Sequence, residues 1–317
     1  MEYLILILSL AGIVLGADFL VKGAVVVARK CRVSSFVIGA VIVGIGTSLP
    51  ELVVSTVGAI GGNSEVAIGN VVGSNIFNVF AILGLTALFF PIAVSRENMK
   101  FEIPFCIAVS ILLMLLVYNF FIVGEPRLGR WDGAALLLVF TSFMWISLRR
   151  GKSSAATVGE SVEEENKSLW FAAFSILGGL AGLIVSSNFF VDEAVAIARK
   201  LGVSDAFISI TLLACGTSLP ELAASVTAAV KKDTDMALGN IIGSNIFNAT
   251  MILGTASLIT PLTTGKIGLV DYGAMILAAV LPMIFGIRGK ITRFEGLLML
   301  LCYAAYTWYI VTYVMAV

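Results

Sequence analysis

Two glutamates stand inside long apolar stretches of this 317-residue chain. Glu51 and Glu221 each end the hexapeptide GTSLPE, which occurs twice, letter for letter, at an offset of 170 residues. If these stretches cross a bilayer, each carboxylate costs at least about 2.5 to 3.5 kcal/mol without a partner, and such residues are functional by default. The structural alternative is a protonated acid in an interhelical hydrogen bond. Duplication of the whole hexapeptide favours a functional pair.

The residues just before each glutamate add further oxygen ligands. Pro50 and Pro220 have no N–H, so they predict a kink that leaves nearby backbone carbonyls, including those of Thr47 and Thr217, without partners. Bare backbone is tolerated at membrane depth only where protein or a water-filled cavity covers it. Each hexapeptide also carries two hydroxyls, from Thr47 and Ser48 in the first copy and from Thr217 and Ser218 in the second.

A second repeated motif predicts a polar stripe on a neighbouring helix. GNVVGSNIFN at 69–78 recurs as GNIIGSNIFN at 239–248. The spacing i, i+4, i+8 places three polar side chains of each copy on one helix face. Small and amide residues also pack helices together in bilayers, and taken alone these residues fit that role equally well. Their repetition beside a buried glutamate favours ion ligands, namely Asn70, Ser74 and Asn78 in one copy and Asn240, Ser244 and Asn248 in the other.

The available ligand atoms are carboxylate, carbonyl, hydroxyl and amide oxygens, which select hard cations. Ca2+ takes about 6 to 8 oxygens, whereas Mg2+ demands strict octahedral geometry and fits less well. Two glutamates would balance the charge of one Ca2+, and the same oxygens could hold Na+ instead. The chain has no histidine, and its four cysteines form no CxxC pair, which argues against zinc and against a disulfide framework.

The elements that must position these ligands are membrane-spanning helices. The chain is 59% apolar and only 13% charged, with a mean hydropathy of +1.04, whereas soluble domains are about 45 to 50% apolar and about 25% charged. The composition therefore predicts an all-α polytopic membrane protein. Ten candidate transmembrane helices can be read at about 2–28, 35–61, 65–90, 101–123, 131–149, 169–198, 205–230, 235–259, 269–287 and 294–316.

The repeat divides the chain into two equivalent halves. Residues 1–150 form the first five-helix repeat, 151–168 a polar linker, and 169–317 the second five-helix repeat. Because five is odd, the second repeat must enter the membrane from the opposite side. Two inverted-topology repeats are typical of secondary transporters, whose substrate site lies near the midplane between the halves. Channels can share this architecture, so it indicates the fold more directly than the activity.

The basic residues predict the orientation in the cell membrane. Fourteen Lys and Arg fall on the side of the linker and five on the other side, so the linker is predicted to be cytoplasmic and both termini extracellular. Lys22 lies within the first span, where Asp18 at i−4 is its expected partner. The 20 basic and 20 acidic residues balance, which argues against nucleic acid as a partner.

No enzyme signature accompanies these features. Without histidine there is neither an HExxH motif nor a Ser-His dyad, and no GxSxG is present. Gly151, Lys152 and Ser153 imitate the end of a P-loop, but Ile146 stands where its first glycine belongs. The sequence therefore predicts a protein that is not an enzyme and has no cofactor.

The paired GTSLPE and GSNIFN motifs resemble the alpha-repeats of the cation/Ca2+ exchanger superfamily, and specifically its Na+/Ca2+ exchanger branch. The resemblance covers essentially the whole chain, with ten spans, a central loop and motifs in spans 2, 3, 7 and 8. It implies an alternating-access antiporter in which Na+ entry drives Ca2+ extrusion, with spans 1 and 6 sliding against the rest. The central loop is too short for the regulatory Ca2+-binding domains of some relatives.

The resemblance also implies a ligand set. Glu51 and Glu221 would be the central Ca2+ and Na+ ligands, and Asn248 stands where K+-dependent relatives carry Asp, which argues against K+ co-transport. Ca2+ and Na+ would be transported substrates, and the partner would be the lipid bilayer around a monomer. Thr47 and Thr217 would add backbone carbonyls, and Gly44 and Ala214 would add backbone oxygens to flanking Na+ sites. The remaining implied ligands are the hydroxyls of Ser48, Ser74, Ser218 and Ser244, for Na+, and the amides of Asn78 and Asn248.

Two other functions remain open at this point. A H+/Ca2+ exchanger of the same superfamily would use the same fold, but that branch usually reads GNxxE where this chain has GTSLPE. The hydroxyls kept here suit Na+. A passive cation channel could use the same carboxylates as a filter, and it would pass Ca2+ without a counter-ion.

Overall fold

The computed structural model describes residues 2–118, 126–153, 168–202 and 214–314. Within them, eight helices are long and apolar enough to cross a membrane, and the bent pair 35–47 and 49–60 makes a ninth span. The predicted seventh span, 205–230, lies partly outside the described residues, so the count of ten stays a prediction. The chain is a nearly all-helical, multi-pass membrane protein, as the composition indicates.

The helices of the two repeats follow the same order along the chain. The first repeat contains α1 (Glu2–Cys31), α2 (Ser35–Ile38), α3 (Gly44–Thr47), α4 (Leu49–Ile60), α5 (Ser64–Phe77), α6 (Gly84–Phe89), α7 (Arg96–Lys100), α8 (Glu102–Tyr118) and α9 (Arg130–Ser153). The second contains α10 (Leu169–Lys200), α12 (Ala214–Gly216), α13 (Leu219–Val230), α14 (Thr234–Phe247), α15 (Leu253–Ile259), α16 (Leu269–Gly286) and α17 (Arg293–Tyr309). Helix α9 extends to Ser153, and the predicted linker beyond it lies mostly outside the described residues.

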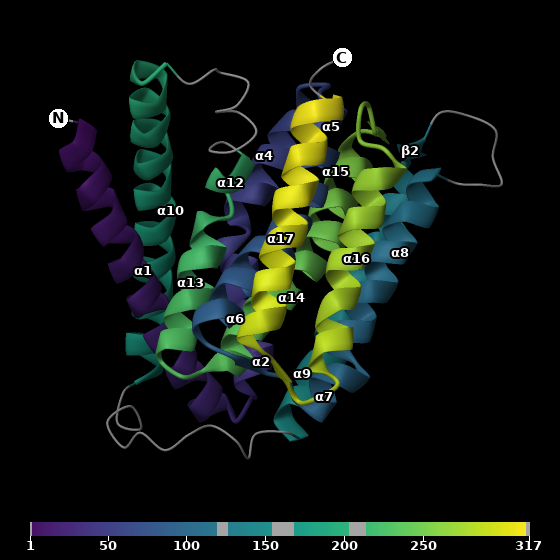
Figure 1. Ribbon diagram of the computed structural model, residues 1–317. Helices are drawn as coiled ribbons and strands as arrows, with labels where there is room; N and C mark the ends of the chain where they lie inside the picture. The colour runs from purple at the N-terminus through teal and green to yellow at the C-terminus, as the bar shows by residue number, and fades with distance from the viewer. Residues whose placement is uncertain (1, 119–125, 154–167, 203–213, 315–317) are drawn as a thin grey trace.

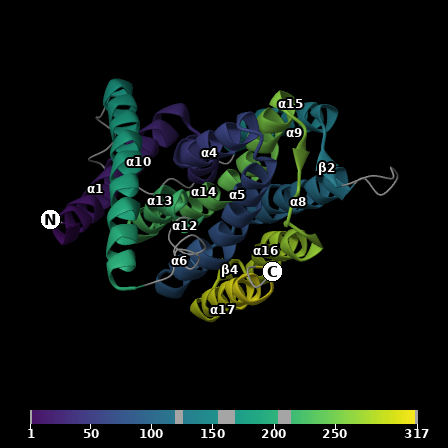
Figure 2. The same ribbon diagram turned by 90° about the horizontal axis from the view of Figure 1, so that it is seen from above.

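Helices α1 and α10 form a pair at one side of the molecule, while the motif-bearing helices α4, α5, α13 and α14 occupy the middle (Figures 1 and 2). The pair crosses closely at Gly16 and Gly179. A Cβ on Gly16 would lie 2.8 Å from the backbone N of Leu183, and one on Gly179 would lie 2.6 Å from the backbone N of Leu20. Only glycine permits this approach of two backbones, which small-residue spacing favours in membranes.

The spans that carry GTSLPE are broken, as their prolines predict. Helices α3 and α4 meet at Ser48, where the span bends by 47°, and Pro50 lies in the first turn of α4. Helices α12 and α13 repeat the break at Ser218, with Pro220 in the first turn of α13. Because proline fits the first turn of a helix, each break places its glutamate at a helix start.

The spans that carry GSNIFN do not break, but each passes from α-helix into π-helix. Helix α5 passes into a π-helical segment, η2 (Asn78–Leu83), and α14 passes into η5 (Asn248–Ile252). Further π segments are η1 (Gly39–Val43) and η6 (Ile310–Val314). Such wide turns occur frequently at functional sites. Here two of them begin at the predicted ligands Asn78 and Asn248.

Four two-residue strands join the repeats at the two ends of the bundle. Strand β1 (Ile92–Ala93) pairs antiparallel with β4 (Lys290–Ile291), and β2 (Arg127–Leu128) pairs antiparallel with β3 (Leu262–Thr263). Each ladder takes one strand from each repeat. The hydropathy pattern gives no indication of these strands, because two residues are too few to form a period.

Burial is greatest in the spans that contain α14 and α5. Every residue of α14 from Met236 to Phe247 is buried, whereas large apolar side chains are exposed along α1, α10 and α17, as a lipid-facing surface requires. Three tryptophans, Trp131, Trp170 and Trp308, are among the most exposed of these side chains, and tryptophan is enriched where membrane meets water.

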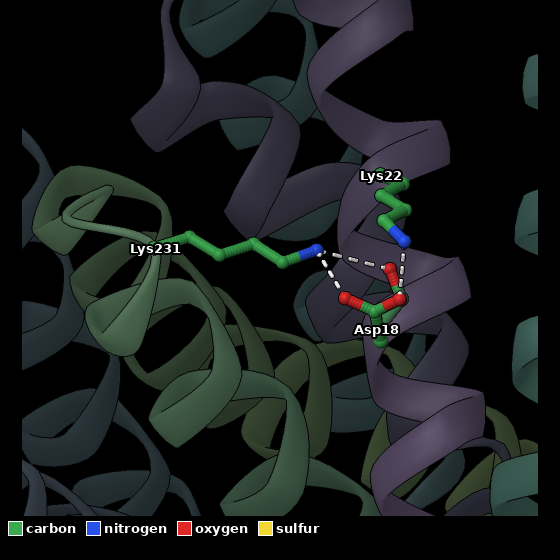
Figure 3. Close-up of polar contacts among 3 residues, drawn as sticks. All are labelled: Asp18, Lys22 and Lys231. Atoms are coloured by element: carbon green, nitrogen blue, oxygen red, sulfur yellow. Dashed lines mark hydrogen bonds and ion pairs between the residues drawn. The ribbon is translucent and has the colours of Figure 1, made fainter.

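One charged cluster ties α1 to the middle of the molecule. The predicted pair of Asp18 and Lys22 is present, with Lys22 Nζ 2.6 Å from Asp18 Oδ2. Lys231, which follows α13, lies 2.7 Å from Asp18 Oδ1 and also donates to the Asp18 carbonyl at 3.2 Å (Figure 3). The sequence spacing predicts the first contact, whereas the second joins residues 213 positions apart.

Candidate ion-binding site

The two glutamates lie in equivalent, fully buried positions and are joined across the repeats. Ser48 Oγ donates to Glu221 Oε1 at 2.8 Å, and Ser218 Oγ donates to Glu51 Oε1 at 3.0 Å. All four side chains are 0% exposed. The serine of each hexapeptide therefore holds the glutamate of the other, which brings the two predicted motifs together into a single site.

The second oxygen of each carboxylate has no protein partner. Glu51 Oε2 and Glu221 Oε2 are buried and accept no hydrogen bond from the described residues. The ion pairs among the described residues involve Asp18 and Glu2, and neither site glutamate takes part in them. Two buried carboxylates without a basic partner can both stay ionised only when a cation from outside the chain balances them, and otherwise they take up protons.

Asn70 and Asn240 position the glutamates through their amide nitrogens, and the ligand roles predicted for their oxygens stay predictions. Asn70 Nδ2 donates to the Glu51 carbonyl at 3.2 Å and to Ser55 Oγ at 3.0 Å. Asn240 Nδ2 makes the matching bonds to the Glu221 carbonyl at 3.1 Å and to Ser225 Oγ at 2.8 Å. Both amides thus fix the first turn of a broken helix against the helix beside it.

Four asparagines link α5 to α14 in a symmetrical network. Asn75 Nδ2 donates to the Asn245 carbonyl at 3.0 Å, and Asn245 Nδ2 donates to the Asn75 carbonyl at 3.1 Å. Asn78 Nδ2 donates to Asn245 Oδ1 at 3.0 Å, and Asn248 Nδ2 donates to Asn75 Oδ1 at 3.2 Å. The side-chain oxygens of Asn78 and Asn248 are therefore turned away from these bonds and remain unpaired.

The i, i+4, i+8 spacing does not identify Asn75 and Asn245. They lie one residue beyond Ser74 and Ser244, on a different part of the helix surface. The repeated GSNIFN motif does contain both of them. Repetition of each letter, rather than helical periodicity, is the signal that could have identified them.

Six buried oxygen atoms of the predicted residues have no hydrogen-bond partner within the described part of the chain. They come from carboxylate, hydroxyl and amide groups, and no sulfur or nitrogen ligand is among them. This donor chemistry fits hard cations. The six atoms are Glu51 Oε2, Glu221 Oε2, Ser74 Oγ, Asn78 Oδ1, Asn248 Oδ1 and Thr217 Oγ1.

Other predicted ligands already have protein partners. Ser244 Oγ donates to the Gly44 carbonyl at 3.2 Å, and that carbonyl also accepts the backbone N–H of Ser48 at 3.1 Å. Thr47 Oγ1 donates to the Val43 carbonyl at 3.0 Å. Ala214 is the first residue of α12, at the edge of the described segment. The ligand roles of these four residues stay predictions.

A cavity of about 730 Å³ reaches the polar stripe from the side of the molecule. Its lining runs from Glu65, in the first turn of α5, to Asn70 and Ser74 further along that helix, with Tyr303 and Tyr306 of α17 among the residues opposite. The cavity therefore connects the outer turn of α5 with residues of the candidate site.

Broken spans from both halves of the chain, with buried oxygens suited to cations where they meet, are the features of a secondary transporter. The chain belongs to the family described as "Sodium/calcium exchanger protein", whose sequence profile matches residues 1–149 and 171–312. Members of this family are transporters and not enzymes.

Related proteins match the chain over nearly its full length. It is 36% identical to the putative antiporter CaxA of Alkalimonas amylolytica, over 95% of this chain and 96% of that protein. It is 34% identical to the sodium/calcium exchanger MaX1 of Methanosarcina acetivorans, over 96% and 97% of the two chains. The solved structure of the sodium-calcium exchanger NCX_Mj superposes with a TM-score of 0.83 at 32% identity, covering 98% of each chain.

Proposed function

We propose that this chain exchanges Na+ for Ca2+ across the membrane by alternating access. The observation that carries the proposal is the pair of buried glutamates, each bound by the serine of the opposite repeat and each left with one unpaired oxygen. One Ca2+ would neutralise both charges, and so would Na+ ions bound in its place. Exchange requires that competing cations share these ligands.

The unpaired oxygens support a division of roles. Glu51 and Glu221 are the central ligands for either cation, and Asn78 and Asn248 add unpaired amide oxygens. Ser74 and Thr217 add free hydroxyls for Na+. Ser48 and Ser218 hold the carboxylates in place and add their own lone pairs.

Access from the outside is supported by the cavity that joins Glu65 to Asn70 and Ser74. In the proposed orientation both termini are extracellular, the 151–168 linker is cytoplasmic, and a single chain in the bilayer is the functional unit. Helices α1 and α10 would slide together past the motif helices to close this side and open the other.

The test is Na+-driven Ca2+ uptake. Purified protein in Na+-loaded liposomes, diluted into Na+-free medium with 45Ca2+, should take up Ca2+. Glu51→Gln and Glu221→Gln should each abolish this uptake, because a neutral amide cannot balance the bound cation. The control is Glu295→Gln, since Glu295 only caps α17 and glutamine can cap equally well.

Two results would contradict Na+/Ca2+ exchange. Equal uptake driven by a pH step without Na+ would indicate a H+/Ca2+ exchanger. Uptake that persists without any counter-ion gradient would indicate a channel. A requirement for K+ alongside Ca2+ would contradict the reading of Asn248 as a neutral ligand.

A further inference from the structure

A second polar cavity contains none of the residues of the glutamate site, and it is lined by residues of α2 and α7, which lie at one end of the bundle (Figure 1). Its volume is about 260 Å³. The lining includes three carboxylates, from Glu97, Glu102 and Asp235, and one guanidinium, from Arg150. Ser34, Ser95 and Asn98 add hydroxyl and amide groups. The charged groups leave this lining with a formal charge of −2.

Glu102 is the residue that sets this cavity apart from an ordinary acidic surface. It begins α8, is only 4% exposed, and its Oε2 has no hydrogen-bond partner among the described residues. No ion pair within 4.0 Å joins it to Arg150, whose guanidinium lies 4.8 Å from the centre of the Phe101 ring. A buried carboxylate oxygen without a donor keeps its charge only with a cation or water as its partner, and otherwise takes up a proton.

Asp235 brings the second repeat into the same cavity. It lies in the first turn of α14, and Asn98 Nδ2 donates to its Oδ1 at 3.5 Å. Its neighbour Asp233 already caps α14 by accepting the Met236 N–H at 3.0 Å. The cap leaves Asp235 available to a ligand in the cavity, and that ligand would lie between the start of α14 and the start of α8.

The repeat-related position at the opposite end of the bundle lacks these features. Glu65 is the counterpart of Asp235, but its Oε1 accepts the Lys266 N–H at 2.9 Å. Ile267 and Tyr272 stand in place of Glu97 and Glu102. Among the described residues, the carboxylates of Glu97 and Glu102 therefore have no acidic counterpart in the other repeat, whereas the glutamates of the central site come from both repeats.

We infer that this cavity binds one Ca2+, held by Glu102 and Asp235 with part of its water shell retained. A divalent cation matches the formal charge of −2. Within the described residues no three acidic, thiol or imidazole side chains lie close enough to share a metal ion, so water must complete the coordination. The volume suffices, because a water molecule takes about 30 Å³ in the liquid. The mixed ligand set suits Ca2+ better than Mg2+, which demands strict octahedral geometry.

Bound Ca2+ would connect the first turn of α14 to α8 in the opposite repeat. Asn240, which holds the Glu221 carbonyl, lies five residues along α14 from Asp235. The inferred site could therefore bias the central site from one face of the membrane. Its existence does not depend on the proposed exchange.

The test measures Ca2+ binding in a chain whose central site cannot bind. Purified Glu51→Gln/Glu221→Gln protein is titrated with 45Ca2+ by equilibrium dialysis in Na+-free buffer. One Ca2+ per chain should remain bound. Adding Glu102→Gln or Asp235→Asn should weaken this binding at least about tenfold, because each removes one ligand charge. Adding Glu65→Gln, the repeat-related control, should leave it unchanged.

Three results would overturn the inference. They are no saturable binding in the double variant, binding that survives both Glu102→Gln and Asp235→Asn, and displacement of Ca2+ by an equal concentration of Mg2+. Thermal unfolding without Ca2+ serves as the folding control. Glu102→Gln should unfold no earlier than its parent, since Oε2 loses no hydrogen bond. Because the central glutamates are absent, failure here leaves the exchange proposal intact.

Discussion

The two repeats agree closely at the centre of the molecule and differ at its ends. At the centre, the bond from Ser48 to Glu221 is matched by that from Ser218 to Glu51, and the asparagine network has the same symmetry. Away from the centre, Asp18 and Lys22 of α1 are replaced by Asn188 and Asp192 at the repeat-related positions of α10. An ion that is bound in the same way by both halves can be released to either side. Any difference between the two sides of the membrane in ion binding or release must then come from residues that differ between the repeats.

The largest expected effect tests the symmetry of the asparagine network. Asn75→Ala removes the hydrogen bonds that Asn75 makes to the Asn245 carbonyl, to Met275 Sδ and from the Asn248 amide. The Asn245 carbonyl keeps the backbone N–H of Asn248, but the buried Asn248 amide loses its acceptor. An unpaired buried group costs about 1 to 3 kcal/mol. Asn245→Ala should destabilise the protein by the same amount. Thermal unfolding in detergent measures both, and Asn63→Ala, an exposed cap without a side-chain bond, is the control. Clearly unequal losses of stability in the two variants would show that Asn75 and Asn245 do not contribute equally to the network.

The crossed serines test the symmetry of the ion site itself. Ser48→Ala and Ser218→Ala each remove one hydrogen bond to a carboxylate, a contact with a net contribution of about 1.5 to 3 kcal/mol. Each variant should weaken the apparent affinity for Ca2+ in Na+-driven uptake by about tenfold or more. Ser110→Ala should have no such effect, since Ser110 bonds only to its own helix. A loss confined to one repeat would contradict a shared site.

The crossing of α1 and α10 can be tested with two adjacent glycines. A Cβ on Gly179 would meet the backbone of α1, whereas one on Gly178 would meet nothing within 4 Å. Gly179→Ala should therefore cost about 1 to 3 kcal/mol through overpacking and slow the transport cycle. Gly178→Ala should leave unfolding temperature and uptake rate unchanged. If both variants behaved alike, the close crossing would not matter to function.

The smallest expected effect belongs to a contact present in one half only. Lys231→Met removes the ion pair that joins α13 to Asp18, whereas Gly61 occupies the repeat-related position (Figure 3). Both side chains are about one-third exposed, so unfolding should change by less than about 1 kcal/mol. The difference should shrink at high salt. Lys232→Met, one residue further and exposed, is the control. A larger loss of unfolding free energy in Lys231→Met that persists at high salt would contradict a solvent-exposed ion pair.

Much of this arrangement could be predicted from the sequence, because the recurring motifs identify equivalent residues in the two halves of the chain. Two identical hexapeptides with buried glutamates predict broken helices and a shared site, and the structure confirms the breaks and brings Glu51 and Glu221 into one hydrogen-bonded group. The i, i+4 spacing likewise predicts the pair of Asp18 and Lys22.

The rest of the site depends on which helices pack against each other, and the periodicity of the sequence does not contain that information. Helical spacing places Asn70 with the predicted ligands, yet its amide is used to hold the Glu51 carbonyl. Asn75 and Asn245 find their partners only because α5 and α14 pack together. The acidic cavity joins Glu102 and Asp235 from different repeats, and no local pattern relates them.

The two short strand ladders limit how this molecule can move. Each fastens one repeat to the other, at opposite ends of the bundle, through β1 with β4 and β2 with β3. Separation of the two repeats at either end would therefore break the backbone hydrogen bonds of the ladder at that end. Neither α1 nor α10 belongs to a ladder within the described residues. If the proposed sliding of α1 and α10 takes place, the ladder-joined helices would stay together while this pair moves past them.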